Sequence, residues 1–201
     1  LELCRKNFVL PHFDERKSVI REQVMDLAAQ EEAQLELDED LLDEVTSLVE
    51  WPRALAGGFD RTFLEVPPEV LISAMKEHQR YFHLVDKSGR LVPRFITISN
   101  IESLDSSQVV AGNERVIRPR LADAAFFFER DTRTSLAEKF GRLEYVVFQA
   151  DLGTYAEKCR RISELAGYIA EQLDLDKDAA TRAGLLCKAD LVSDMVSEFP
   201  D

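Results

Sequence analysis

The feature that most constrains the fold is a change in the spacing of apolar residues near the middle of the chain. Two stretches rich in aromatic and β-branched residues, Tyr81–Val85 and Leu91–Ser99, indicate strands. Asp86-Lys-Ser-Gly89 between them is typical of a tight turn, so the two strands are predicted to form a hairpin. On either side, apolar residues recur at every third and fourth position, which indicates helices. A hairpin between helical segments predicts the α+β class.

The helices are predicted from this spacing and from residues that start or stop a helix. Trp51-Pro52 ends the second helix, Gly57-Gly58 indicates a loop or sharp bend, and Asn100–Ser107 reads as a polar loop. Pro119 should kink or restart the fourth helix. Tyr145–Phe148 is a short apolar run that fits a helix or a strand equally. The predicted helices span 14–30, 38–49, 69–77, 113–129, 151–173 and 178–198.

The order of these elements suggests three regions along the chain. A helical N-terminal segment covers residues 1–54, and a central mixed α/β region covers 55–134. A further helical region begins at 135 and runs to 201, after a cluster of charged, Thr and Ser residues between Glu129 and Ser135. The chain is expected to be an internal piece of something longer.

The charge of the chain argues against a general nucleic-acid binder. The sequence holds 38 acidic and 25 basic side chains, a formal net charge of −13. The first fifty residues contribute 14 acidic and 5 basic side chains, so most of the imbalance lies in one terminal quarter. Because net charge does not describe a local patch, a basic site elsewhere in the chain stays possible.

Several common chemistries are missing from the sequence. It has no Gly-rich phosphate loop, no His-Glu-x-x-His helix and no Gly-x-Ser-x-Gly elbow. Its three histidines are too scattered to suggest a metal site, and three widely spaced cysteines suggest reduced thiols in a cytoplasmic protein. No apolar run approaches the roughly 18 residues that cross a bilayer, so no membrane role is expected. Neither a catalytic residue nor a bound cofactor is predicted.

The first candidate site lies where a helix is predicted to meet a strand. His78, Gln79 and Arg80 form a polar edge there, and Arg80 could contact a phosphate. Tyr81 and Phe82 could stack on bases, but an alternating pattern of core and surface is the better reading for these two aromatic residues.

The second candidate site is Gly112–Arg120. Arg115 and Arg118 are three residues apart on one predicted helix face, and Arg120 would lie nearby if Pro119 bends the chain. Three guanidinium groups near a helix start could hold a phosphate backbone. Pairing with acidic residues of the same chain explains the arginines equally well. Phe126-Phe127-Phe128, which follows, is expected to pack in a core.

The third candidate is the apolar stretch that carries Cys187-Lys188. Its frame resembles the metal-binding helix of HD-domain phosphohydrolases, where a His-Asp doublet follows two leucines. Lysine at neutral pH has no lone pair for a metal, so Cys187 and Lys188 would be HD-like positions without ligands. An ordinary amphipathic helix with solvated polar residues is the equal alternative.

Taken in order, these stretches resemble the β subunit of the bacterial two-subunit glycyl-tRNA synthetase. No single segment is diagnostic, but their order and spacing together are specific, and the resemblance covers nearly the whole chain. The segments that carry it are His78–Phe82, Gly112–Arg120 with Leu121-Ala-Asp123 and Phe126-Phe127, Val147-Phe148-Gln149 with Leu152-Gly153-Thr154, and Lys188–Leu191 with Glu198-Phe199-Pro200.

The resemblance implies a fold and a set of partners. The central region would resemble the editing-domain fold of phenylalanyl-tRNA synthetase, and the helical region from 135 would resemble an HD domain. The α subunit would carry the ATP- and magnesium-dependent chemistry in a cytoplasmic α2β2 enzyme, and the β subunit would position glycine tRNA. Arg115, Arg118 and Arg120, with His78 and Arg80, would then contact the tRNA.

Three hypotheses follow for the chain itself. The first is a non-catalytic tRNA-binding and scaffold segment. The second is an editing hydrolase for mischarged tRNA, which is disfavoured because a site shaped for glycine excludes larger amino acids sterically. The third is a structural module that holds the α subunit.

Overall fold

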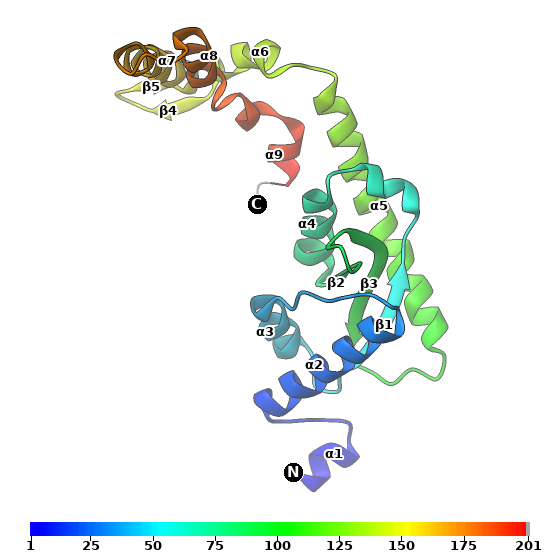
Figure 1. The fold of residues 1–201 in the computed structure, drawn as a ribbon. Coiled ribbons are helices and arrows are strands. Elements are labelled where there is room, and N and C mark those ends of the chain that lie inside the picture. Colours follow the sequence, from blue (N-terminus) through cyan, green and yellow to red (C-terminus); the bar gives the residue numbers. More distant parts are fainter. Residues whose placement is uncertain (200–201) are drawn as a thin grey trace. The chain divides into compact units, whose positions relative to one another are not determined.

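The computed structural model describes residues 1–199, and these divide into two compact units on either side of the bond between Ala125 and Phe126. Each unit is described separately below (Figure 1). No helix among the described residues is both long and apolar enough to cross a membrane. The first unit contains α1 (Glu2–Lys6), α2 (Phe13–Gln30), α3 (Glu39–Leu48), β1 (Arg53–Gly58), η1 (Arg61–Glu65), α4 (Pro68–Gln79), β2 (Phe82–Val85), β3 (Leu91–Ser99) and most of α5 (Ser106–Thr132).

A three-stranded antiparallel sheet organises the first unit, in the order β1-β3-β2. The predicted hairpin is confirmed as β2 and β3, joined by a turn at Asp86. One Asp86 carboxylate oxygen accepts hydrogen bonds from the backbone N–H groups of Ser88 (2.8 Å) and Arg90 (3.1 Å). Gly89 has a φ of 77°, which the left-handed turn position requires and a glycine adopts without strain.

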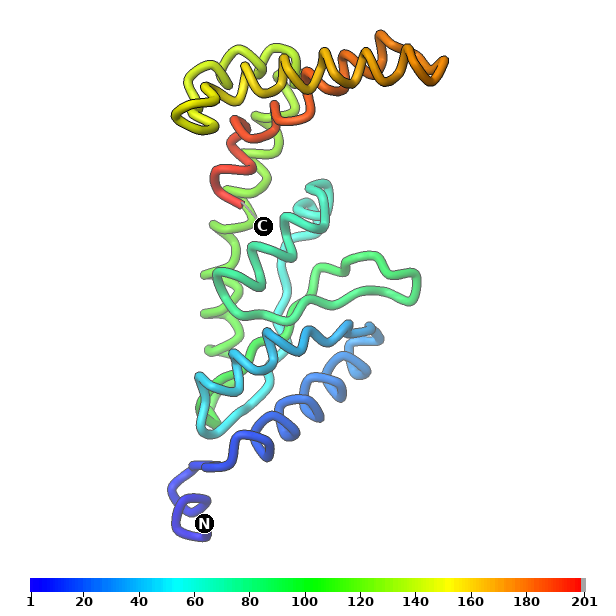
Figure 2. Tube along the Cα trace, turned by 90° about the vertical axis from the view of Figure 1, so that its left-hand side faces the viewer, coloured from blue at the N-terminus to red at the C-terminus, as the bar shows by residue number. Residues whose placement is uncertain are grey.

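Helices α2 and α3 cover one face of this sheet (Figure 2). Ile20, Val24 and Leu42 from these helices are fully buried against Leu84 and Ile96 of the strands. Burying a branched aliphatic side chain stabilises a fold by roughly 1.5–3 kcal/mol. Residues before and after position 54 therefore share one core. The predicted division into the regions 1–54, 55–134 and 135–201 remains a prediction.

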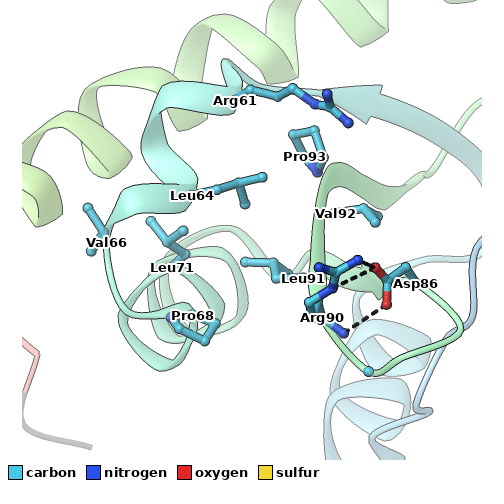
Figure 3. A pocket seen from close by; sticks show the side chains of 11 residues that line it. Arg61, Leu64, Val66, Pro68, Leu71, Asp86, Arg90, Leu91, Val92 and Pro93 are labelled. Carbon is cyan, nitrogen blue, oxygen red and sulfur yellow. Dashed lines mark hydrogen bonds and ion pairs between the residues drawn. The ribbon is translucent and has the colours of Figure 1, made fainter.

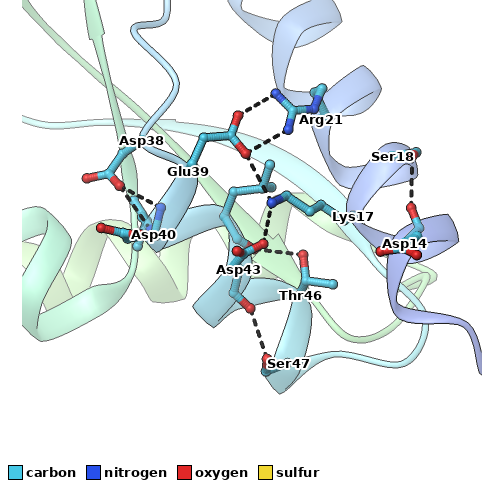
Figure 4. Close-up of polar contacts among 12 residues, drawn as sticks. Asp14, Lys17, Ser18, Arg21, Asp38, Glu39, Asp40, Asp43, Thr46 and Ser47 are labelled. Carbon is cyan, nitrogen blue, oxygen red and sulfur yellow. Dashed lines mark hydrogen bonds and ion pairs between the residues drawn. The ribbon is translucent and has the colours of Figure 1, made fainter.

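Ion pairs join α2 and α3 on their solvent side (Figure 4). Arg21 donates from both terminal nitrogens to the two carboxylate oxygens of Glu39, at 2.7 and 2.8 Å. Lys17 lies 3.0 Å from Glu39 and also pairs with Asp43. Asp38, predicted as the first residue of this helix, caps it by accepting from the backbone N–H groups of its first turn.

The opposite face of the sheet carries Phe95, which stacks on Tyr81 with 4.4 Å between ring centroids. Helix α5 is tied to this part of the unit by two hydrogen bonds. Tyr81 donates its hydroxyl to Asn113 at 2.6 Å, and the backbone N–H of Gly58 donates to Glu114 at 2.8 Å. These bonds fix the N-terminal half of α5 beside β1.

One expectation for the first unit is wrong, and one alternative of a second is excluded. Gly57-Gly58 is not a loop but the end of β1, paired with β3. A Cβ at Gly57 would lie 2.5 Å from the Phe95 ring, so the glycine lets that ring cover the strand. Pro119 does not restart a helix, because α5 is one helix from Ser106 to Thr132 with the proline inside it, and a kink at Pro119 remains a prediction. Proline removes only one backbone donor from a helix of 27 residues.

The second unit is mainly helical, and Thr154 with Glu157 forms a capping box at the start of α7. A Cβ at Gly184 of α8 would come within 2.8 Å of the Ser163 Cα in α7, so these two helices cross at close range. Its remaining elements are α6 (Leu136–Lys139), η2 (Phe140–Tyr145), β4 (Val147–Gln149), β5 (Gly153–Thr154), α7 (Tyr155–Gln172), α8 (Lys177–Leu186), η3 (Ala189–Val192) and α9 (Asp194–Glu198).

The predictions for the second unit are partly right. The helix over 151–173 is confirmed as α7, although a short strand precedes it. The single helix over 178–198 is wrong, because the chain forms α8, η3 and α9 instead. Cys187 ends α8 with its thiol donating to the Gly184 carbonyl, and Ser193 caps α9. Phe126 is exposed rather than packed in a core, which contradicts the expectation for that residue.

A buried ion pair stabilises the second unit. Lys139 is 5% exposed and donates to the carboxylate and to the carbonyl of Asp131. The same aspartate accepts the backbone N–H of Met195 at 2.8 Å. Burial acts to raise the pKa of Asp131, but hydrogen bonds from Lys139 and from the start of α9 prevail and hold it below the usual range.

At the level of class, the structure confirms a mixed α/β protein with many helices and small sheets. The likenesses to the phenylalanyl-tRNA synthetase editing domain and to an HD domain remain predictions.

Candidate nucleic-acid interface

Three arginines of α5, Arg115, Arg118 and Arg120, are exposed. Within the described residues, Arg115, Arg118 and Arg120 form no ion pair or hydrogen bond with another side chain or the backbone. Other arginines of the first unit are paired, as Arg21 is with Glu39 and Arg94 is with Glu31. No acid of the described residues forms an ion pair or hydrogen bond with these three arginines, although Asp60 lies close enough to Arg118 for their charges to interact.

Helical geometry places these three arginines on two sides of α5. Residues three apart are separated by about 60° around a helix axis, and residues two apart by about 160°. Arg115 and Arg118 consequently share a side, while Arg120 lies across the buried stripe of Ile117 and Leu121. The structure does not bring Arg120 beside the other two, because Pro119 leaves the helix unbroken.

Arg118 opens onto a cavity of about 490 Å³ between η1, β3 and α5. Arg61, the first residue of η1, lines the same cavity and also has no ion pair or hydrogen bond within the described chain. Phe59 and Phe63 contribute half-buried rings to the wall. Sequence reasoning missed Arg61 and both phenylalanines, because no local pattern shows that η1 folds against α5.

The acidic groups of this cavity have partners of their own. Glu114 accepts the backbone N–H of Gly58. Asp60 caps η1, and the backbone N–H and then the hydroxyl of Thr62, with a smaller contribution from the Arg118 charge, hold the Asp60 pKa below its usual range. Asp60 therefore stays ionised near neutral pH and can accept hydrogen bonds from a ligand.

A second cavity of about 510 Å³ adjoins the first, and Arg61 and Pro93 line both (Figure 3). Its lining is largely apolar, with Leu64, Leu71 and Leu91 among the lining side chains. Arg90 at its rim is paired with Asp86. The pKa of Asp86 lies below its usual range, first because Ser88 and then the backbone N–H of Arg90 donate to it.

His78 and Arg80 lie at the end of α4, as expected from the sequence. Arg80 adopts a left-handed conformation with a φ of 58°, and its guanidinium pairs with Glu44 and donates to the Glu77 carbonyl. His78 is exposed in the last turn of the helix. Contacts within the chain thus hold Arg80, unlike Arg115, Arg118 and Arg120.

The two aromatic residues that follow are both buried, whereas an alternation of core and surface predicts one of them at the surface. Tyr81 is 2% exposed and Phe82 is 1% exposed, so neither presents a face for a base. Burial raises the pKa of Tyr81 to about 12, which keeps its hydroxyl protonated as the donor to Asn113. The two candidate segments therefore meet through this hydrogen bond.

Cys187 and Lys188 fall at the end of α8, not inside a continuous helix. The Cys187 thiol faces the buried Cys159 of α7, and burial first, then this neighbouring thiol, raises the Cys159 pKa. No group of three or more His, Cys, Asp or Glu side chains within residues 1–199 is arranged to hold a metal ion.

Comparison with known proteins gives one consistent result. A family model described as "Glycyl-tRNA synthetase beta subunit" matches residues 1–201. The chain is 54% identical over its full length to the glycine–tRNA ligase beta subunit of Chromohalobacter salexigens, and 55% identical to that of Azotobacter vinelandii. Over 195 residues it is 55% identical to the corresponding subunit of Pseudoalteromonas atlantica. It spans 28–29% of the length of these relatives.

Proposed function

Because the chain belongs to the glycyl-tRNA synthetase beta-subunit family, we propose that it is a non-catalytic tRNA-binding and scaffold portion of that subunit. The relatives carry the name of a ligase that joins glycine to tRNA. In this proposal the whole protein works in the cytoplasm in an α2β2 assembly. ATP, magnesium and glycine bind at the α subunit, and this chain helps to hold the tRNA.

The observation that carries the proposal is the pair of unpartnered, exposed arginines on one side of α5. Arg115 and Arg118 keep their charges free in a chain that holds 38 acidic side chains. An unpaired guanidinium at the surface suits a phosphate group, because it can donate two parallel hydrogen bonds to two of the phosphate oxygens. Arg120 could reach a phosphate only along a different side of the helix.

A structural role in subunit assembly is supported by a different observation. Helix α7 leaves Leu165, Tyr168 and Ile169 exposed at helical spacing, with Leu173 exposed just beyond its end. Contiguous apolar side chains on a surface often mark a protein interface. The scaffold part of the proposal therefore rests on the second unit, and the tRNA-binding part on the first. Nothing comparable supports an editing hydrolase.

The test is glycine tRNA binding to the full-length subunit across a salt series. The Arg115→Ala, Arg118→Ala double variant should weaken binding and flatten the dependence of log K on log salt by about 1.4–1.8, because each lost phosphate contact removes about 0.7–0.9 from the slope. Arg5→Ala is the matched control, since Arg5 is an exposed arginine of the same unit that pairs with Glu15.

Equal slopes for the double variant and the wild type would contradict the tRNA-binding part. Weakened subunit assembly after Leu165→Ser with Ile169→Ser, with tRNA affinity unchanged by the arginine changes, would instead favour the purely structural role.

A further inference from the structure

The cavity between η1, β3 and α5 combines the groups that bind a single nucleotide. We propose that it holds one unpaired nucleotide of an RNA strand, with Arg61 and Arg118 on the phosphate and Phe59 or Phe63 against the base. The inference rests on the proposed tRNA-binding function and deepens it, because it specifies an unpaired nucleotide rather than a duplex.

The phosphate position follows from Arg61 and Arg118. Both line the cavity, from η1 and from α5, and neither has an ion pair or hydrogen bond within the described chain. Arg94, the third arginine of the lining, already binds Glu31, with its Nε donating at 2.7 Å. Two free guanidinium groups that converge from separate elements can hold one phosphate with several charge-assisted hydrogen bonds.

The carboxylates of the cavity favour a nucleotide over a bare anion. Asp60 and Glu114 balance the two free arginines in charge, so a small anion gains little net attraction there. A nucleotide offers both partners, since its phosphate binds arginine and its base carries N–H donors that a carboxylate accepts. The mixed lining therefore suits a ligand with one anionic end and one donor-bearing end.

The two phenylalanines select for a base that is out of a duplex. Unpaired bases stack on aromatic side chains, whereas paired bases in an RNA helix are hidden from them. A cavity of about 490 Å³ lies in the size range of small-ligand sites and is too small for a base pair with its backbone.

The adjoining apolar cavity favours a strand over a free mononucleotide. Arg61 and Pro93 line both cavities, so a phosphate on Arg61 would lie between two neighbouring nucleotide positions. Leu64 and Leu91 offer apolar surface to the second base (Figure 3). A short single strand should consequently bind more tightly than a mononucleotide.

The test uses the full-length subunit and a fluorescein-labelled single-stranded RNA tetramer, read by fluorescence anisotropy. Unlabelled competitors are a blunt RNA duplex, AMP and inorganic phosphate. Two variants probe the site, Arg61→Ala for the phosphate and Phe63→Leu for the base. Arg61 is exposed, so its loss leaves the fold intact, and thermal unfolding checks the Phe63 variant. Arg5→Ala again serves as the matched control.

We expect each variant to weaken tetramer binding about fivefold or more, through the loss of one charge-assisted contact or one stacked base. The Arg5→Ala control should change the affinity for the tetramer less than twofold. Unlabelled tetramer should displace the probe far more efficiently than the duplex or phosphate, and more efficiently than AMP. If phosphate displaces the probe as effectively as the tetramer does, the cavity is a simple anion site and the proposal is overturned. If AMP displaces the probe better than the tetramer does, the claim that the cavity binds a strand rather than a mononucleotide is overturned.

Absence of tetramer binding in the wild type would also overturn the inference. The proposed tRNA-binding function is tested separately, by measuring tRNA binding to the Arg115→Ala variant. If Arg115→Ala weakens tRNA binding while Arg61→Ala and Phe63→Leu leave it unchanged, the proposed function stands and the nucleotide site fails. If the tetramer binds through Arg61 and Phe63 while tRNA does not bind, the reverse holds.

Discussion

At the residue scale, two glycines of the first unit have opposite surroundings. An added Cβ at Gly57 would lie 2.5 Å from the Phe95 ring, whereas at Gly112 in α5 it would meet nothing within 4 Å. Gly57→Ala should lower the free energy of unfolding by about 1–3 kcal/mol, because a rigid, stacked ring cannot move aside cheaply. Gly112→Ala should raise it by about 0.5–1 kcal/mol, because alanine is the better helix former.

Chemical denaturation of both variants checks this pair. The Gly112 variant is the matched control, since it adds the same methyl group without a clash. Equal effects of the two substitutions would show that the Phe95 ring does not fix the conformation of β1.

Individual residues also show what a sequence can reveal about a site. The burial of both Tyr81 and Phe82 did not follow from the expected alternation, because alternation predicts one of two neighbouring side chains at the surface and Tyr81 lies just before β2. The exposure of Phe126 also differs from the expectation, although helix geometry allowed it to be foreseen, because three consecutive phenylalanines on a helix point in different directions and cannot all face one core. Arg61 was missed because its importance depends on α5, which lies about fifty residues away in the sequence and meets η1 only in the fold.

At the element scale, the pairing of α2 with α3 should depend on pH. Arg21 first and Lys17 second lower the Glu39 pKa to about 2 from an ordinary value of 4.5. A lowered pKa in the folded state means that ionised Glu39 favours folding. This contribution is complete above about pH 4.5 and disappears as the pH falls towards 2.

The measurement compares the unfolding free energy of the wild type and of Glu39→Gln between pH 2 and pH 7. The difference between the two proteins should be largest above pH 4.5 and shrink steadily below it. Because these groups are exposed, added salt should reduce the difference as well. A difference that does not change with pH would mean that Glu39 contributes through packing alone.

Helices and strands whose apolar residues recur at one clear spacing were predictable. Elements whose bounds depend on contacts with other parts of the fold were not. The strand over Leu91–Ser99 was predicted with its observed bounds, since its side chains alternate between two packed layers. Strand β1 was missed because two glycines, which are poor strand formers, end it, and the space that Gly57 leaves for the Phe95 ring is visible only in the fold. The breaks at Cys187 and Ser193 depend on local hydrogen bonds that the spacing of apolar residues does not reveal.

At the scale of the whole molecule, the net charge of −13 opposes the approach of RNA. Glu22 and Asp26 on α2 are exposed and have no ion pair within the described chain. Glu22→Gln with Asp26→Asn should raise the association rate with glycine tRNA about twofold at low salt, because long-range repulsion falls. The dissociation rate should not change.

Stopped-flow binding at 0.02 M and 1 M salt separates the two contributions. The gain should vanish at 1 M, where charges are screened over about 3 Å. A gain that persists at high salt would indicate that the two acids contact the RNA directly.

The family was also predictable at this scale, from the order of several weak segments rather than from any single motif. The same segments did not locate the cavity that Arg118 shares with Arg61. A cavity is formed by residues that are distant in the sequence, so its lining cannot be read from spacing along the chain. The roles of Arg115, Arg118, Arg120, His78 and Arg80 in tRNA binding remain predictions.

The close crossing of α7 and α8 also constrains which substitutions this sequence can accept during evolution. Because Gly184 lies against the backbone at Ser163, a larger side chain at Gly184 is tolerated only if the two helices separate. Separation would also disturb Gly167 and Thr181, which meet along the same crossing. Substitutions at these positions are therefore tied to one another, and the helical pair should accept them rarely and together while the surrounding surface varies freely.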